Sequence, residues 1–265
     1  AYAAVNTLLA QTKYLSDYPD WLNSIQKNKD SMLSFSIFSD PDSFSGRNIL
    51  KTAEEFEKLQ GVELTLGENG AVKSLLTFSL TDYFLLIMLM IVSVSFLEER
   101  KKGLWNVIHA APGGRLRLAL KRTVILFCTS VFGVLLLYGT NLVIGFFIYG
   151  GYDSLNRSVQ SVELLGGLPQ LSTIGAFLSG WFLLRVGAAF FISLLLWLLL
   201  TALHNVKYTI LITSGVLALE YSLYTFLPVQ SSFNLFKYFN LFTYISMSDL
   251  YTNYLNIDLF GYPFG

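Results

Sequence analysis

The amino-acid sequence predicts an all-α polytopic membrane protein with a small α+β domain at its N-terminus. Two observations predict this fold class. Of the 265 residues, 53% are hydrophobic and only 14% are charged, whereas about 25% of the residues in a typical soluble domain carry a charge. The apolar residues are also concentrated in four long runs, and a helix needs about 20 such residues to cross a bilayer.

The N-terminal segment, residues 1–74, differs from the rest in composition. It contains seven basic and ten acidic residues, which favours a soluble domain that faces water. Capping, turn and alternation signals predict helices over 3–14, 20–29 and 48–59, strands over 33–38 and 62–66, and turns at 40–42 and 69–70. The mixture of helices and short strands places this domain in the α+β class.

We predict the four apolar runs as transmembrane helices over residues 75–97, 123–149, 174–203 and 208–227. Together they make residues 75–228 a transmembrane domain. None resembles a cleavable signal peptide, because none is N-terminal with a short apolar region. The last segment, 229–265, is rich in Phe and Tyr but too interrupted to span a bilayer. Since aromatic side chains favour the membrane–water interface, we expect an interfacial or re-entrant helix around residues 235–254.

The distribution of Lys and Arg predicts the orientation of these spans. The loop of residues 98–122 contains seven basic residues, whereas each of the other two loops and the tail contains one. Because cytoplasmic loops carry an excess of Lys and Arg, we predict that 98–122 is cytoplasmic and that 1–74 and 229–265 lie outside. The expected location is a bacterial plasma membrane, with several crossings.

An outer N-terminal domain raises the question of how it is translocated. Residue 1 is Ala rather than Met, and the chain carries no signal peptide. We therefore expect a further span before residue 1 and another after residue 265, so that the chain is a portion of a longer protein. An engineered fragment is the alternative.

The cytoplasmic loop has a pattern of its own. Glu98 and Glu99 stand at the end of a span, and Leu104, Trp105, Ile108 and Ala111 then recur at near-helical spacing. Pro112-Gly113-Gly114 ends this short amphipathic segment. The pattern favours a docking helix at the cytoplasmic mouth; the alternative is an ordinary basic loop whose charges meet anionic lipid headgroups.

The loop EERKKGLWNVIHAAPGGRLRLALKR resembles the one between the second and third spans of ABC-2-type exporter permeases. That loop has acidic residues, a Gly, a short coupling helix, a Pro and an Arg, and then a Lys that enters the next span. The matching residues are Glu98, Glu99, Gly103, Leu104, Pro112, Arg115 and Lys121. Trp105 departs from the pattern, because a smaller or polar residue is common there, and this puts the shape of the partner surface in doubt.

The wider layout is similar to the subset of these permeases with a large extracellular domain between spans one and two. On that mapping the chain holds the outer domain and spans two to five of six. The resemblance implies the transmembrane subunit of an ATP-driven exporter for an amphipathic cargo (a peptide, lipid or drug-like molecule). The residues implied to couple it to the ATPase are Glu98, Glu99, Gly103, Leu104, Trp105, Ile108, Pro112 and Arg115.

The resemblance also implies partners: ABC ATP-binding subunits that carry ATP and Mg, and a second permease subunit, identical or different, in contact with membrane lipid. This chain has no G-x-x-x-x-G-K-[ST] phosphate loop, so we do not expect it to be an enzyme. The formal net charge is zero, which gives no reason to expect a nucleic-acid partner. His109 and His204 stand alone, so the sequence predicts no metal site and no cofactor in this chain.

Three ionisable residues fall inside predicted spans, where charge is costly and usually functional or paired. They are Asp82, Arg185 and Glu220. Counted from the cytoplasmic end of each span at about 1.5 Å per residue, all three lie at similar heights in the outer half of the bilayer. An Arg between two carboxylates would form a neutralising cluster; snorkelling to the outer interface is the alternative.

Two other function classes stay open. An ion-coupled secondary transporter would use Asp82, Arg185 and Glu220 as its coupling site. That class usually has internal repeats and spans broken by Gly or Pro, and we find neither in the sequence. A membrane sensor would bind its ligand in the outer domain. Only the exporter requires a stoichiometric ATPase.

Overall fold

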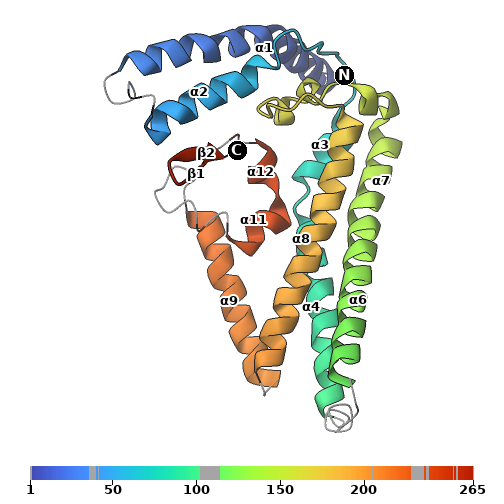
Figure 1. The fold of residues 1–265 in the computed structure, drawn as a ribbon. Helices are drawn as coiled ribbons and strands as arrows, with labels where there is room; N and C mark the ends of the chain where they lie inside the picture. The colour runs from blue at the N-terminus through green and yellow to red at the C-terminus, as the bar shows by residue number, and fades with distance from the viewer. Residues whose placement is uncertain are drawn as a thin grey trace. The chain divides into compact units, whose positions relative to one another are not determined.

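The fold is described from a computed structural model of the chain, which places residues 2–35, 40, 42–101, 114–203, 206–227, 236, 239–252, 254 and 256–264. Helices account for most of these residues (Figure 1). The chain divides into two compact units. The N-terminal unit comprises Ala1–Lys73, Ile148–Leu178 and Asp249–Gly265, and the apolar unit comprises Ser74–Phe147 and Ser179–Ser248.

Two long helices lie side by side in the N-terminal unit (Figure 1). The first, α1 (Tyr2–Ser34), continues through Pro19, where the sequence predicts two separate helices over 3–14 and 20–29. An interior Pro costs a helix about 3 kcal/mol. On either side of it, however, the buried Tyr18 and Leu22 pack with Phe56 and Leu59, and this tertiary packing outweighs the local cost.

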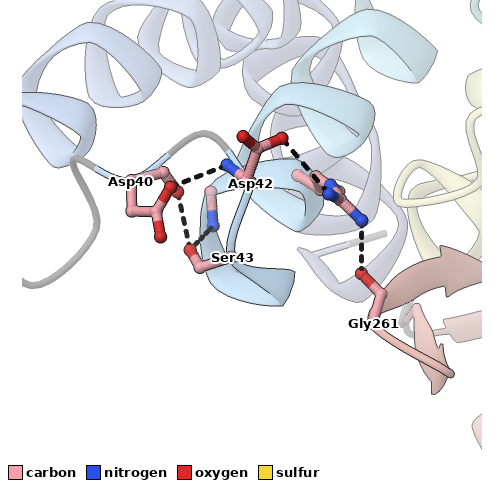
Figure 2. A network of polar contacts seen from close by, with 6 residues as sticks. Asp40, Asp42, Ser43 and Gly261 are labelled. Atoms are coloured by element: carbon pink, nitrogen blue, oxygen red, sulfur yellow. Dashed lines mark hydrogen bonds and ion pairs between the residues drawn. The ribbon is translucent and has the colours of Figure 1, made fainter.

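The second helix, α2 (Phe44–Glu57), begins at a compact polar turn (Figure 2). Ser43 caps it: its hydroxyl accepts the N–H of Gly46 at 3.1 Å and donates to the Asp40 carbonyl at 2.7 Å. The Asp40 carboxylate accepts the N–H of Asp42 at 3.0 Å. Caps of this kind satisfy N–H groups that have no partner inside the helix. Asp40 and Asp42, the described residues of the predicted turn, therefore lie just before the cap of α2.

The two predicted strands of the N-terminal segment are wrong where the structure describes them. Residues 62–69 have no regular structure. The Thr65 N–H donates to the Ser161 hydroxyl at 3.2 Å, and its carbonyl accepts from Arg157 at 3.1 Å. Side chains therefore take the place of a partner strand. In the other predicted strand, 33–38, the first two residues belong to α1 and residues 36–38 lie outside the described part.

The strands of the structure lie instead at the end of the sequence, where we predict none. β1 (Ile257–Leu259) and β2 (Tyr262–Phe264) form an antiparallel hairpin in which Ile257 pairs with Phe264. The hairpin contacts α2: Arg47 donates to the Gly261 carbonyl at 3.2 Å (Figure 2), and Lys51 donates to the Pro263 carbonyl at 2.9 Å.

A segment of short 3₁₀ turns completes the N-terminal unit, although the sequence treats it as a loop between spans. Its turns are η2 (Tyr152–Asn156), η3 (Val159–Ser161) and η4 (Glu163–Leu165). Two phenols of α1 donate to its backbone, Tyr14 to the Gln160 carbonyl at 2.8 Å and Tyr18 to the Gly166 carbonyl at 3.1 Å. Burial raises the pKa of Tyr18 to about 12, so this phenol keeps its proton at neutral pH.

The apolar unit contains the helices that the sequence assigns to the membrane. In the described residues, two helices are long and apolar enough to cross a bilayer: Gly114–Tyr149, with 36 residues, and Ile174–Ala202, with 29. The first joins α6 (Gly114–Val134), a π-helical turn η1 (Leu135–Gly139) and α7 (Thr140–Tyr149); the second is α8. The sequence places the start of this first span at 123, but the helix begins nine residues earlier.

The other two predicted spans are less regular. The run over 75–97 falls on α3 (Gly70–Thr77) and α4 (Leu80–Lys101), which are bent by 48° at their junction and qualify as a candidate span when taken as a pair. The run over 208–227 falls on α9 (Val206–Phe226), whose apolar part, Ile210–Phe226, is shorter than a span. The described part of the chain thus contains two clear candidates and one bent pair.

The single helix predicted around 235–254 is also corrected. In its described part the chain forms two short helices, α11 (Leu241–Ser246) and α12 (Ser248–Thr252). Met247 separates them with a left-handed backbone, φ 56°, which a helix cannot continue through. Asn240 caps α11 by accepting the Phe242 N–H at 2.8 Å.

We predict that Gly166→Ala destabilises the N-terminal unit by about 1–3 kcal/mol, as overpacking does, because its new Cβ would collide with the Tyr14 hydroxyl. Tyr14→Phe removes that oxygen and costs about 1 kcal/mol for the lost hydrogen bond. Equilibrium unfolding of both single variants and the double variant tests this. The double variant should lose less free energy of unfolding than the two single variants lose in sum. Strictly additive losses would contradict the contact.

Candidate functional site

The candidate site is a group of four side chains buried among the helices of the apolar unit: Asp82, Tyr138, Trp181 and Arg185, called here the Asp82 cluster. Asp82 lies in the first turn of α4, directly after the bend that separates α3 from α4. Its N–H bonds to the Ser79 carbonyl at 3.0 Å. A carboxylate in the first turn is stabilised by the helix dipole, so the bend creates a favourable place for a negative charge.

Tyr138 comes from the π-helical turn η1. This turn widens the long helix by one residue, and such single π turns occur frequently at functional sites. The Tyr138 side chain is completely buried, and its hydroxyl donates to Asp82 Oδ1 at 2.6 Å. The π turn thus coincides with the residue that the long helix contributes to the cluster.

Arg185 on α8 supplies the positive charge. Its Nη2 donates to the same Oδ1 of Asp82 at 2.9 Å, and the two side chains are 3% and 10% exposed. The guanidinium carbon lies 4.4 Å from the Tyr138 ring centroid and 4.6 Å from that of Trp181. Trp181 precedes Arg185 by one helical turn, so both side chains are on one face of α8. Cation–π contacts of this kind stabilise a desolvated guanidinium.

The electrostatics of the cluster follow from this geometry. A buried charge without a partner is very costly, so the Asp82 carboxylate and the Arg185 guanidinium each depend on the other. Tyr138 adds a second hydrogen bond to the same carboxylate oxygen. Arg185 Nε and Nη1 are buried and have no hydrogen-bond partner in the described part of the chain. The cluster joins α4, the η1 turn and α8 through one carboxylate, and it retains donor capacity.

The structure brings together two of the three ionisable residues that the sequence singles out. Glu220 is not in the cluster: among the described residues no ion pair links it to Arg185. Its carboxylate accepts the Leu241 N–H at 3.0 Å, and its carbonyl accepts from Asn240 at 2.6 Å. Glu220 therefore anchors the start of α11 on α9. Equal height along a span does not decide which helices are neighbours, and this is why the three-residue grouping is corrected.

Most of the predicted coupling residues lie outside the described part of the chain. These are Gly103, Leu104, Trp105, Ile108 and Pro112. Glu98 and Glu99 are in the last turns of α4, and Arg115 is exposed in the first turn of α6.

Arg122, which the sequence assigns to the end of the basic loop, is instead buried within α6 at 3% exposure. Its guanidinium lies 5.3 Å from the Phe96 ring and donates to the Phe96 carbonyl at 3.5 Å. These contacts help to stabilise the buried guanidinium, because a charge buried without partners is costly. Arg122 therefore links α6 to the end of α4.

Sequence reasoning missed Tyr138 and Trp181. Trp181 stands four residues before Arg185, and this spacing of an aromatic and a cation on one helix could have indicated a contact. Tyr138 lies inside an apolar run and carries no such signal. Among the described residues, no group of three or more His, Cys, Asp or Glu side chains could hold a metal ion.

Comparison of the chain with models of known protein families, with curated proteins and with solved structures finds no match.

We predict that Arg185→Met destabilises the apolar unit by about 3–5 kcal/mol, the cost of leaving one buried partner charged and alone. Asp82→Asn should be costly for the same reason, and the double variant should recover much of the loss. Unfolding by an anionic detergent in mixed micelles measures these free energies. Glu220→Gln is the control: combined with Arg185→Met its effect should be additive. Additive effects of Arg185→Met and Asp82→Asn would contradict the pairing.

Proposed function

We propose that the chain is the transmembrane part of an ATP-driven exporter that moves an amphipathic cargo and is coupled to a separate ATPase through residues 98–122. The observation that carries the proposal is the position of this segment. Residues 102–113 connect the end of α4 to the start of α6, two helices that pack against each other. A short amphipathic segment between two packed helices can transmit a movement of a cytoplasmic partner to both helices.

The contacts at this end of the helix pair support such coupling. The Arg122–Phe96 contacts connect α6 to α4 within about three helical turns of the segment. Farther from this segment along the same two helices, the Asp82 cluster connects α4 and the η1 turn to α8. Movement of the α4–α6 pair would therefore be transmitted to α8 through packed side chains and one ion pair, as coupling requires.

The proposal includes a membrane layout in a bacterial plasma membrane. The α3–α4 pair forms one bent span, Gly114–Tyr149 and α8 form the next two, and α9 forms the fourth. Residues 1–74 and 229–265 lie outside, and 98–122 is cytoplasmic. ABC ATP-binding subunits hold ATP and Mg, a second permease subunit completes the pathway, and this chain is not itself an enzyme.

An ion-coupled secondary transporter is the second candidate, and the buried Asp82 is the observation that favours it. Intramembrane carboxylates commonly take part in proton relays. Asp82, however, is already bonded to both Arg185 and Tyr138, which makes a structural link the better interpretation. Stoichiometric copurification of an ATPase would separate the two, since only the exporter requires it.

We predict that single cysteines at Lys101 and Lys102 are shielded from an impermeant thiol reagent on intact cells, while those at Lys58 and Lys237 are labelled, because basic loops stay in the cytoplasm. The native Cys128, which is exposed in the structure, must first be replaced by Ser. Labelling after lysis serves as the control for reactivity. Labelling at 101 from outside would overturn the layout.

We predict that Trp105→Ala weakens the complex with the ATPase by about 2 kcal/mol, as truncation of a central aromatic anchor does. The measurement is the vanadate-sensitive ATP hydrolysis that copurifies with the tagged chain from native membranes. Asn106→Ala, on the opposite face of the predicted helix, is the matched control and should retain the activity. Unchanged copurification with Trp105→Ala would contradict the coupling role and favour an ordinary basic loop.

A further inference from the structure

A pocket of about 540 Å³ lies in the N-terminal unit, between α1 and the segment of 3₁₀ turns. Its volume suits a small ligand, since small-molecule sites usually measure about 300–1,000 Å³. The pocket shares no lining residue with the Asp82 cluster or with the predicted coupling segment, and the proposed function gives it no role.

One wall of the pocket is aromatic. Tyr14, Tyr18 and Trp21 follow one another at helical spacing on one face of α1, with ring centroids 5.7 Å and 5.3 Å apart along the series. Both phenol hydroxyls are bonded to the backbone of the 3₁₀ segment, so these groups hold the wall in place. Trp21 remains 41% exposed. The Trp21 ring is therefore available to a ligand in the pocket.

The charges that line the pocket are mainly negative. Asp17 from α1 and Glu163 from η4 contribute two carboxylates, and Lys13 contributes one ammonium. Glu163 also lies 3.5 Å from Lys73 Nζ, in a partly exposed ion pair, and Asp17 accepts from the Ser16 hydroxyl at 3.2 Å. The lining thus combines π faces with the Asp17 carboxylate, for which no ion pair is found among the described residues, and with the Glu163 carboxylate, whose charge Lys73 partly balances. Together, π faces and a carboxylate attract a positive charge.

We propose that this pocket binds a small organic cation, an alkylated or primary ammonium group, which lies against the Trp21 face and between Asp17 and Glu163. Among the aromatic side chains, Trp attracts a cation most strongly, and rings with carboxylates are a recurrent means of recognising ammonium groups. An anion would gain less, because it could not use the π faces and would lie near the Asp17 and Glu163 carboxylates as well as the Lys13 ammonium. A neutral molecule of the same shape would gain the apolar contact and lose the electrostatic part. The proposal depends on neither the exporter assignment nor the membrane orientation.

The test is isothermal titration calorimetry on the full chain in a non-ionic polyoxyethylene detergent, which carries neither choline nor sugar. The probes are choline, its neutral carbon isostere 3,3-dimethylbutan-1-ol, and maltose. We expect choline to bind at one site. We expect the isostere to bind about fivefold more weakly, or not measurably, because it lacks the cation–π contact. Equal binding of choline and the isostere, tighter binding of maltose, or the absence of choline binding would each overturn the proposal.

Variants place the binding in this pocket. Asp17→Asn and Glu163→Gln should each weaken choline binding about threefold, the scale of a partly exposed charge pair. Asp17→Lys should abolish it. Asp30→Asn, an exposed carboxylate further along α1, is the matched control and should bind as the unmodified chain does.

The aromatic wall is tested separately, because Trp21 also contacts Phe56 at a centroid distance of 5.4 Å and its loss can affect folding. Trp21→Leu should weaken choline binding about fivefold, with the thermal unfolding temperature of each variant measured alongside. Ala10→Phe, which fills the pocket from its exposed rim, should block choline without removing any recognition group. If the carboxylate variants and Ala10→Phe all bind choline normally, the pocket is not the site.

Discussion

The burial of unlike charges between Asp82 and Arg185 is the constraint on which the arrangement of the apolar unit depends. Apolar side chains alone give helices in lipid little reason to choose one register, since lipid tails are as apolar as Leu. A buried carboxylate and guanidinium do fix how two helices align, because separating them leaves each charge buried and unpaired at a large cost in free energy. The bend before α4, the π turn in the long helix and the placement of Trp181 all converge on this pair.

The N-terminal unit is held together differently, by contacts between segments far apart in the sequence. Tyr14 and Tyr18 bond to the backbone of the 3₁₀ segment, and Arg47 and Lys51 bond to the hairpin. In each case a side chain of a helix donates to a backbone carbonyl of a segment distant in the sequence. These bonds hold the 3₁₀ segment and the hairpin against the two helices.

The sequence predicts the apolar helices well where hydrophobicity alone decides, as in Gly114–Tyr149 and Ile174–Ala202. It fails where tertiary contacts override local signals. Pro19 predicts a break that packing of Tyr18 and Leu22 removes, and the alternation in 62–66 predicts a strand that finds side chains in place of a partner. For the candidate site, intramembrane charge identifies Asp82 and Arg185. The exclusion of Glu220 and the participation of Tyr138 depend on helix rotation, which no pattern in the sequence reports.

The N-terminal unit is built from three segments that are far apart in the sequence, and this has a consequence for biosynthesis. Phe56 packs edge-on against Tyr254, with 5.6 Å between ring centroids, so an aromatic core that begins in α1 and α2 is completed by residues made almost 200 positions later. At a synthesis rate of roughly 5–20 residues per second, the two rings emerge about 10–40 s apart. During that interval the apolar helices are made while the first two helices present an open aromatic surface. Transiently exposed surface of this kind is what chaperones bind. The unit can complete its folding only after the helices encoded between its parts have been made.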